Sequence, residues 1–174
     1  MTPGEGTSVA GAETASADRA DAPPDASEPN RAPDLTREYH AAGITVEWYA
    51  TRCIHSGNCV RALPQAFDPR RRPWVEPSAA SADEVARAVL RCPTGALHFV
   101  RHDGGAQETP DVPTTATHAP FGPMYMRGDL AVRGTGETVI RQDTRLALCQ
   151  CGVTQRAPFC DNGCRTPAPQ SVAT

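Results

Sequence analysis

The chain has 174 residues, and its composition excludes several classes of protein. Aromatic residues make up only 5%, whereas there are 14 glycines and 17 prolines, so no large hydrophobic core can form. The net charge of −3 gives no case for nucleic-acid binding. We expect two very small domains, whose ordered parts need a source of stability other than apolar burial.

Seven cysteines, an odd number, fit a disulfide framework poorly and favour metal or iron–sulfur ligation. No apolar run approaches the roughly 20 residues that cross a membrane. The N-terminus lacks the charged start and apolar stretch of a secretory signal. We therefore predict a cytoplasmic protein without a membrane partner, in a compartment where thiols stay reduced.

The first half of the chain reads as a tail followed by a small α+β unit. Residues 1–38 are mostly Ala, Pro, Ser, Thr, Gly and acidic residues, which predicts a disordered tail. Alternation around β-branched and aromatic residues predicts a strand over 43–49. A second strand is predicted over 97–100, and it most simply pairs with the first.

Between these strands the sequence predicts short helices. Residues 60–63 can form one helical turn, which Pro64 ends. Ser81 and Glu84 have the spacing of a capping box, which predicts a helix that runs on to Arg91 and stops before the Cys92-Pro93 pair.

The second half is predicted to be rich in β-strands. Residues 103–119 show no periodicity and read as a linker. A small antiparallel sheet is then expected to lead into a cysteine loop, and 167–174 should be a flexible C-terminus. The expected strands are four short runs separated by turns: 124–127, 130–133, 138–141 and 146–148.

The first candidate metal site consists of Cys53, Cys59 and Cys92. Small ferredoxins hold a cluster with Cys-x2-Cys-x2-Cys and a remote Cys-Pro. Cys53 and Cys59 keep the outer spacing of that motif, Cys92 precedes proline, and Ser56 stands at the position of the middle cysteine. On the residues alone, three buried structural cysteines are the alternative.

The stretch CIHSGNCVRALPQAFDPRRRPWVEP, with CPTGAL further on, resembles a divergent single-cluster ferredoxin domain over residues 39–102. The resemblance implies a 4Fe–4S cluster. Because only three thiolates are present, a 3Fe–4S cluster is equally open, as is a 4Fe–4S cluster whose fourth iron takes water, Ser56 or His55. His55 also suits a place beside the ligands rather than among them.

The second candidate site consists of Cys149, Cys151, Cys160 and Cys164. Cys-x-Cys followed by Cys-x3-Cys can put two thiolates on each of two irons, and the Asn162-Gly163 pair favours a left-handed turn. Four cysteines also suit tetrahedral zinc, so zinc stays open as the alternative.

This region resembles the CDGSH iron–sulfur domain of the mitoNEET class over residues 120–166. That family's pattern is matched at Cys149, Cys151, Thr154, Pro158, Cys160 and Asp161. The family binds a 2Fe–2S cluster through three cysteines and one histidine, and Cys164 stands at the histidine position. A thiolate there adds negative charge, so we expect a lower reduction potential and no cluster loss that follows a pKa near neutrality.

Together these features predict an α+β protein: a small ferredoxin-like cluster domain with two strands and short helices, then a small β-rich CDGSH-type domain. We expect a two-cluster, one-electron carrier that exchanges electrons with a reductase or oxygenase. It is not expected to be an enzyme, because no catalytic triad, phosphate loop or dinucleotide motif is recognisable. The resemblance also leaves a homodimer through the CDGSH-type domain open. The alternatives are a non-redox module that stores or senses clusters or metal, a zinc-stabilised interaction module, and an accessory subunit of a larger oxidoreductase.

Overall fold

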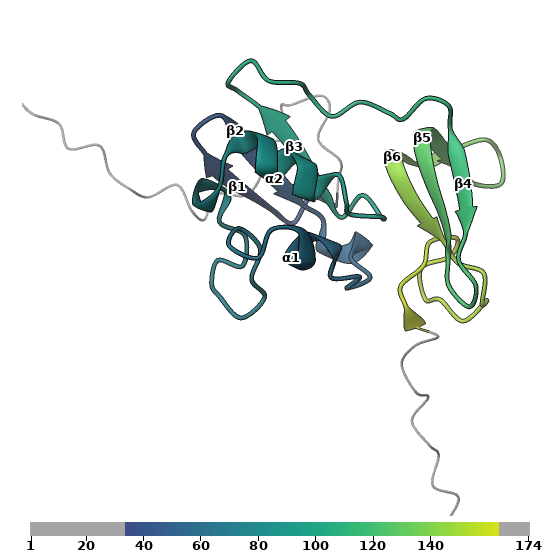
Figure 1. Ribbon diagram of the computed structural model, residues 1–174. Coiled ribbons are helices and arrows are strands. Elements are labelled where there is room, and N and C mark those ends of the chain that lie inside the picture. Colours follow the sequence, from purple (N-terminus) through teal and green to yellow (C-terminus); the bar gives the residue numbers. More distant parts are fainter. Residues whose placement is uncertain (1–33, 164–174) are drawn as a thin grey trace, which may run out of the picture. The chain divides into compact units, whose positions relative to one another are not determined.

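The computed structural model of the protein describes residues 34–163, which form two three-stranded antiparallel sheets and a few short helices (Figure 1). This is broadly the α+β architecture predicted. Most of the expected tail, the expected flexible C-terminus and Cys164 lie outside the described residues. All described residues belong to one compact unit of the chain. No helix in the described range is long and apolar enough to span a membrane.

The first sheet has the order β1-β2-β3, with β1 (Arg37–Ala41), β2 (Ile44–Trp48) and β3 (Leu97–Arg101). The predicted pairing of the two strands is confirmed, with Val46 opposite Phe99. Strand β1 was not predicted, and it begins inside the segment expected to be disordered. Backbone pairing explains the order there, since Thr36 N donates to Trp48 O at 2.8 Å.

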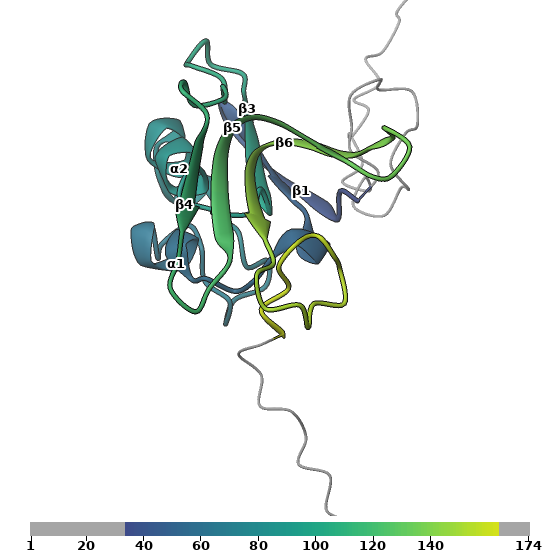
Figure 2. The same cartoon turned by 90° about the vertical axis from the view of Figure 1, so that its right-hand side faces the viewer.

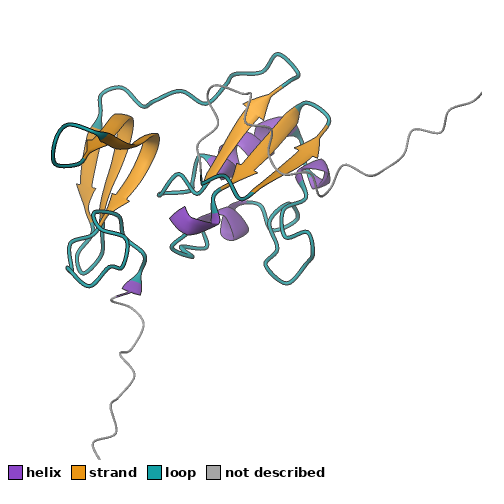
Figure 3. Cartoon of the chain, turned by 180° about the vertical axis from the view of Figure 1, so that it is seen from behind, coloured by secondary structure: helices purple, strands orange, loops and turns teal. Residues whose placement is uncertain are grey.

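One face of this sheet carries the main hydrophobic core. Val46 and Phe99 are cross-strand neighbours, so their side chains point to the same face. Helix α2 (Ala82–Val89) covers that face, as Figures 1 and 3 show, and contributes Val85 and Val89, which are completely buried. The alternation in the strands and the helical spacing in α2 thus meet in a single core.

The predicted capping box starts α2. Ser81 N donates to the Glu84 carboxylate at 3.0 Å, and Glu84 N donates to Ser81 Oγ at 3.3 Å. The helix ends at Val89 rather than at Arg91. The reason is a tighter final turn, in which Cys92 N donates to Val89 O, three residues back, at 2.9 Å.

Two short helical segments frame the first cysteine loop, and a third lies further along the chain. The 3₁₀ helix η1 (Ala50–Arg52) leads into the loop, α1 (Asn58–Ala62) follows it, and η2 (Pro77–Ala79) lies before α2. The single turn predicted over 60–63 corresponds to α1, which ends just before Pro64.

The second sheet has the order β4-β5-β6, with β4 (Thr115–His118), β5 (Met124–Arg133) and β6 (Val139–Leu148), as Figure 2 shows. The four short strands expected here are in fact two long ones. The Gln142–Arg145 segment keeps its ladder to β5 instead of turning. The last residues of the expected linker also differ from the prediction, because they pair with β5 as strand β4.

A bulge replaces the turn expected at Gly128-Asp129. The register slips between Arg127 and Leu130, so β5 bends but continues. Gly128 has φ of 143°, and a Cβ there would lie 2.3 Å from Thr114 Oγ1. Glycine is therefore required where the chain preceding β4 passes over the bulge.

Candidate metal centres

The three cysteines of the first candidate site line one cavity of about 690 Å³. Cys53 follows helix η1, Cys59 lies in the first turn of α1, and Cys92 is buried after α2. Gly57, with φ of 72°, provides the turn from the loop into α1. Secondary structure thus brings together the thiols that the spacing singled out.

One side of the cavity is lined by aromatic rings. Trp48 and Trp74 both line it, and their rings meet edge to face with centroids 5.2 Å apart. Both indole N–H groups are buried and have no hydrogen-bond partner within the described part of the chain. Phe67 is fully buried in the core, and its ring centroid lies 6.1 Å from that of Trp74.

The electrostatics of this cavity disfavour bare thiolates. Burial raises the pKa of Cys53, and burial together with the neighbouring Cys92 raises the pKa of Cys59 to about 11. A cationic metal centre reverses this preference, because it stabilises deprotonated sulfur. Three thiols around one apolar cavity therefore fit an iron–sulfur cluster, and Cys53, Cys59 and Cys92 are the residues that would hold it.

His55 and Ser56, the two side chains considered as a fourth ligand, both line the cavity. The backbone N–H of His55 donates to Cys53 Sγ at 3.4 Å, and His55 has a left-handed φ of 55°. Its side chain is exposed. The visible contribution of His55 is thus a main-chain hydrogen bond to sulfur, which can tune a bound cluster.

The second cysteine loop closes back onto the end of strand β6. Cys149 N donates to Pro158 O at 2.8 Å, and Cys160 N donates to Ala147 O at 2.8 Å. A short bridge between Leu148 and Phe159 accompanies them. Cys149 and Cys160 are therefore fixed on opposite sides of one narrow ladder.

Hydrogen bonds position the sulfur atoms of this loop. Cys149 Sγ and Cys151 Sγ lie 3.4 Å apart. Asn162 has the left-handed backbone that the sequence predicted, with φ of 66°, and its N–H donates to Cys160 Sγ at 3.3 Å. Both loops thus repeat one device: a left-handed residue two positions after a cysteine turns its N–H toward that sulfur.

Two residues of the matched pattern brace the loop. Asp161 accepts hydrogen bonds from Gln155 N and Gly163 N, both at 2.8 Å, and these bonds lower its pKa. Thr154 Oγ1 donates to Phe159 O at 2.7 Å. Cys149, Cys151 and Cys160 are the described residues that would hold a cluster here; the fourth, Cys164, lies outside the described range.

Within the described residues, no three His, Cys, Asp or Glu side chains meet closely enough to hold a single metal ion. The thiols of the first site are instead arranged around a cavity.

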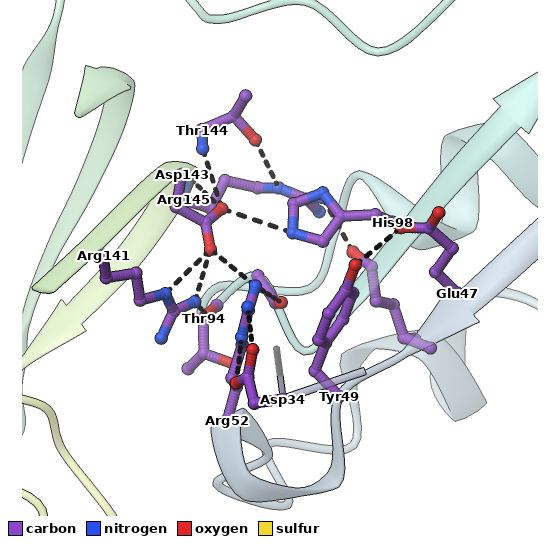
Figure 4. A network of polar contacts seen from close by, with 12 residues as sticks. Asp34, Glu47, Tyr49, Arg52, Thr94, His98, Arg141, Asp143, Thr144 and Arg145 are labelled. Atoms are coloured by element: carbon purple, nitrogen blue, oxygen red, sulfur yellow. Dashed lines mark hydrogen bonds and ion pairs between the residues drawn. The ribbon is translucent and has the colours of Figure 1, made fainter. Parts of the chain in front are cut away.

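A buried ionic network joins strand β6 to the segments that carry Arg52 and Cys92, and the sequence did not reveal it (Figure 4). Arg145 is 1% exposed and donates to the carbonyl oxygens of Val89, Cys92 and Leu97 at 2.6, 3.1 and 2.8 Å. It also pairs with Glu108, at 2.7 Å. The segment expected to be a simple linker is therefore anchored at Glu108.

Asp143 is the second centre of this network. It pairs with Arg52 at 3.2 Å, with Arg141, and with His98 Nε2 at 3.3 Å. Burial raises the pKa of Asp143, but the hydrogen bond and charge of His98 and the charge of Arg141 outweigh it and lower the pKa to about 2. One sequence feature could have pointed to this network. Asp143 and Arg145 are charged residues two positions apart in a strand, and apolar residues follow them directly.

Comparison of the sequence with known proteins identifies two family matches. The model of the divergent 4Fe–4S mono-cluster domain matches residues 39–102, and that of the iron-binding zinc finger of CDGSH type matches residues 121–163. The uncharacterized protein YjdI of Escherichia coli, in strains K12 and O157:H7, is 38% identical over 66 residues, which are 38% of this chain and 86% of the relative. No solved structure matches the chain.

The chain belongs to the family of divergent 4Fe–4S mono-cluster proteins, and it joins that domain to a CDGSH-type iron-binding domain. Both resemblances noted in the sequence are confirmed.

Proposed function

We propose that this protein is a two-cluster, one-electron carrier. The observation that carries the proposal is the convergence of Cys53, Cys59 and Cys92 on one aromatic-walled cavity. A cluster bound there supplies a site that gains and loses one electron. The 4Fe–4S and 3Fe–4S forms both suit three thiolates, and a 2Fe–2S cluster suits the second loop with Cys164 as its fourth ligand.

The protein's own groups would bind the clusters, exclude water and stabilise charge. Trp48 and Trp74, which pack against the core and line the first cavity, would shield a cluster there from solvent on one side. The N–H groups of His55 and Asn162 donate to ligand sulfurs, which stabilises negative charge on them and favours the reduced state. These are the roles expected of residues around a carrier site, and we propose a carrier rather than an enzyme.

The partner that we propose is an acidic reductase or oxygenase. A second cavity, of about 470 Å³, is lined by Arg61, Arg91 and Arg127 together with His55 and Ser56 of the first cysteine loop. Positive charge at the edge of a redox loop steers an acidic surface toward it. We propose the cytoplasm as the compartment and leave a homodimer as a further assembly, with neither nucleic acid nor membrane as partner.

Another group of positive charges is the Arg70–Arg72 run, of which Arg72 lines the first cavity. Arg71 donates to Gln65 O at 3.2 Å, Arg72 donates to Pro69 O at 3.0 Å, and Arg70 pairs with Asp68. These bonds brace the run's own loop.

The test is anaerobic purification followed by counts of iron, acid-labile sulfide and zinc per chain, with Mössbauer typing. A brown protein with two cluster types and reversible EPR signals supports the carrier. Colourless protein with stoichiometric zinc supports the zinc-stabilised module instead. Iron that binds but cannot be reduced reversibly supports storage or sensing.

A further inference from the structure

The two cysteine loops share one small hydrophobic cluster. Ile54, the residue after Cys53, is buried together with Ala147 and Cys160. Ala147 precedes Cys149 by two positions and accepts the backbone hydrogen bond of Cys160. The side chain of Ile54 thus belongs to the base of the second loop, although its backbone belongs to the first.

Charged side chains also cross the junction, by which we mean the contact between the base of the second cysteine loop and the segments that carry the first site. Arg141 donates to Thr94 O, two residues after Cys92, and its guanidinium lies 5.0 Å from the ring centroid of Phe159, next to Cys160. Arg141 therefore contacts residues close to one cysteine of each site.

Strand β6 carries the parts that hold this junction together. Arg141 and Arg145 of this strand donate to carbonyl groups in the segment that follows α2. The strand ends at Leu148, directly before the second loop. Arg145 is buried with its guanidinium bonded to three carbonyl oxygens, one of them that of Cys92. A buried guanidinium with this many partners is costly to displace, so the junction is fixed in place.

We propose that the two cysteine sites form one coupled pair, in which Ile54 is the contact residue and the charge held at one site shifts the reduction potential of the other. The proposal rests on the proposed function. A buried apolar contact excludes water, and charges interact more strongly across a medium of low dielectric constant. The state of one site then sets how readily the other accepts an electron, and the chain works as a two-site relay.

The first experiment tests the contact in the full chain and does not depend on iron. Ile54→Ala removes the side chain shared with Ala147 and Cys160, so we expect amide hydrogen exchange in peptides spanning residues 147–160 to rise several-fold. The matched control is Val153→Ala, because Val153 lies in the same loop but is 55% exposed. Equal exchange in Ile54→Ala and Val153→Ala would overturn the contact.

The second experiment tests the electrostatic coupling in iron-loaded protein. The double substitution Cys149→Ala and Cys151→Ala empties the second site and removes its negative charge, so the reduction potential of the first centre should rise. Ile54→Ala should make this rise smaller by admitting water. If the potential of the first centre is the same with the second site filled or empty, the coupling is overturned but the carrier function still holds. If the chain binds no iron, the carrier function is refuted, and the exchange data still report whether the contact exists.

Discussion

His98 lies between two carboxylates, with Nδ1 3.1 Å from Glu108 and Nε2 3.3 Å from Asp143. Arg145 also approaches Nδ1, and the ring packs edge to face on Tyr49. Burial lowers the pKa of His98, but its hydrogen bonds to Asp143 and Glu108 and their charges outweigh burial and raise it to about 9. The imidazole is therefore held as a cation in the folded protein.

This pKa predicts that stability falls at alkaline pH. The folded pKa of His98 is about 9 and the ordinary value is 6.5, so its contribution is fully present below pH 6.5 and is lost as pH rises through 9. A shift of this size corresponds to about 3 kcal/mol. We expect the thermal midpoint of the wild type to drop between pH 6.5 and 9.5, and this drop should be largely absent in His98→Gln.

The control is His118→Gln, because His118 is exposed in strand β4. It should keep the wild-type pH profile. A His98→Gln profile parallel to that of the wild type would contradict the assignment of His98 as a folded-state cation.

Asp161 offers a second test on a single side chain. Asp161→Ala removes the acceptor for Gln155 N and Gly163 N, so both backbone N–H groups lose the partner that holds them in the loop. The second loop should open more often, and its iron should be lost to a chelator several-fold faster, measured by visible absorbance. Gln155→Ala, which changes only an exposed side chain, should lose iron at the wild-type rate; an equally fast loss there would show that the Asp161 bonds do not hold the loop.

Strand β6 combines two tasks, because it completes the second sheet and also places Arg145 in a set of carbonyl groups beyond that sheet. Arg145→Met removes the guanidinium and leaves Glu108 and three carbonyls without their buried partner. Losing one member of a buried pair costs about 3–5 kcal/mol. We expect a loss of this order in the free energy of unfolding, measured by urea titration.

Arg133→Met on β5 is the matched control, since Arg133 is exposed and donates to Glu137 O in its own hairpin. Its effect should stay below about 1 kcal/mol. Similar losses in the two variants would mean that burial of Arg145 adds nothing to stability.

The elements also show how far the sequence could reach. The capping box at Ser81 and the alternation of β2 and β3 are local patterns, so α2 and the strand pair could be predicted. The continuity of β5 through Gly128-Asp129 could not, because a bulge uses the same residues as a turn. The cysteine loops were recognisable from spacing, whereas Arg145 was not, because an arginine is normally exposed and its burial depends on carbonyl groups supplied by distant segments.

For the whole molecule, charge near the first loop should govern the speed of electron exchange. Arg61, Arg91 and Arg127 line a cavity beside His55 and Ser56, so an anionic oxidant should be attracted there. Reduced protein should react with ferricyanide several-fold more slowly in Arg91→Glu than in wild type at low salt, measured by stopped flow. High salt should erase the difference by screening.

Arg87→Glu makes the same charge change on the exposed side of α2, away from the residues that line this cavity. It should slow the reaction less than Arg91→Glu does. Equal effects of the two substitutions would mean that the rate depends on net charge alone and that the cavity is not the site at which ferricyanide is attracted.

The chain has two tryptophans, and both belong to the wall of the first cavity. Iron–sulfur chromophores absorb where indoles emit, so each fluorophore would sit beside its own quencher. Ultraviolet-excited emission should be dim in loaded protein and should brighten as a chelator strips the first centre, giving a label-free gauge of occupancy. Emptying the second site alone by Cys149→Ala and Cys151→Ala should leave most of the quenching in place, so full brightness in that variant would mean that the indoles report on a different centre.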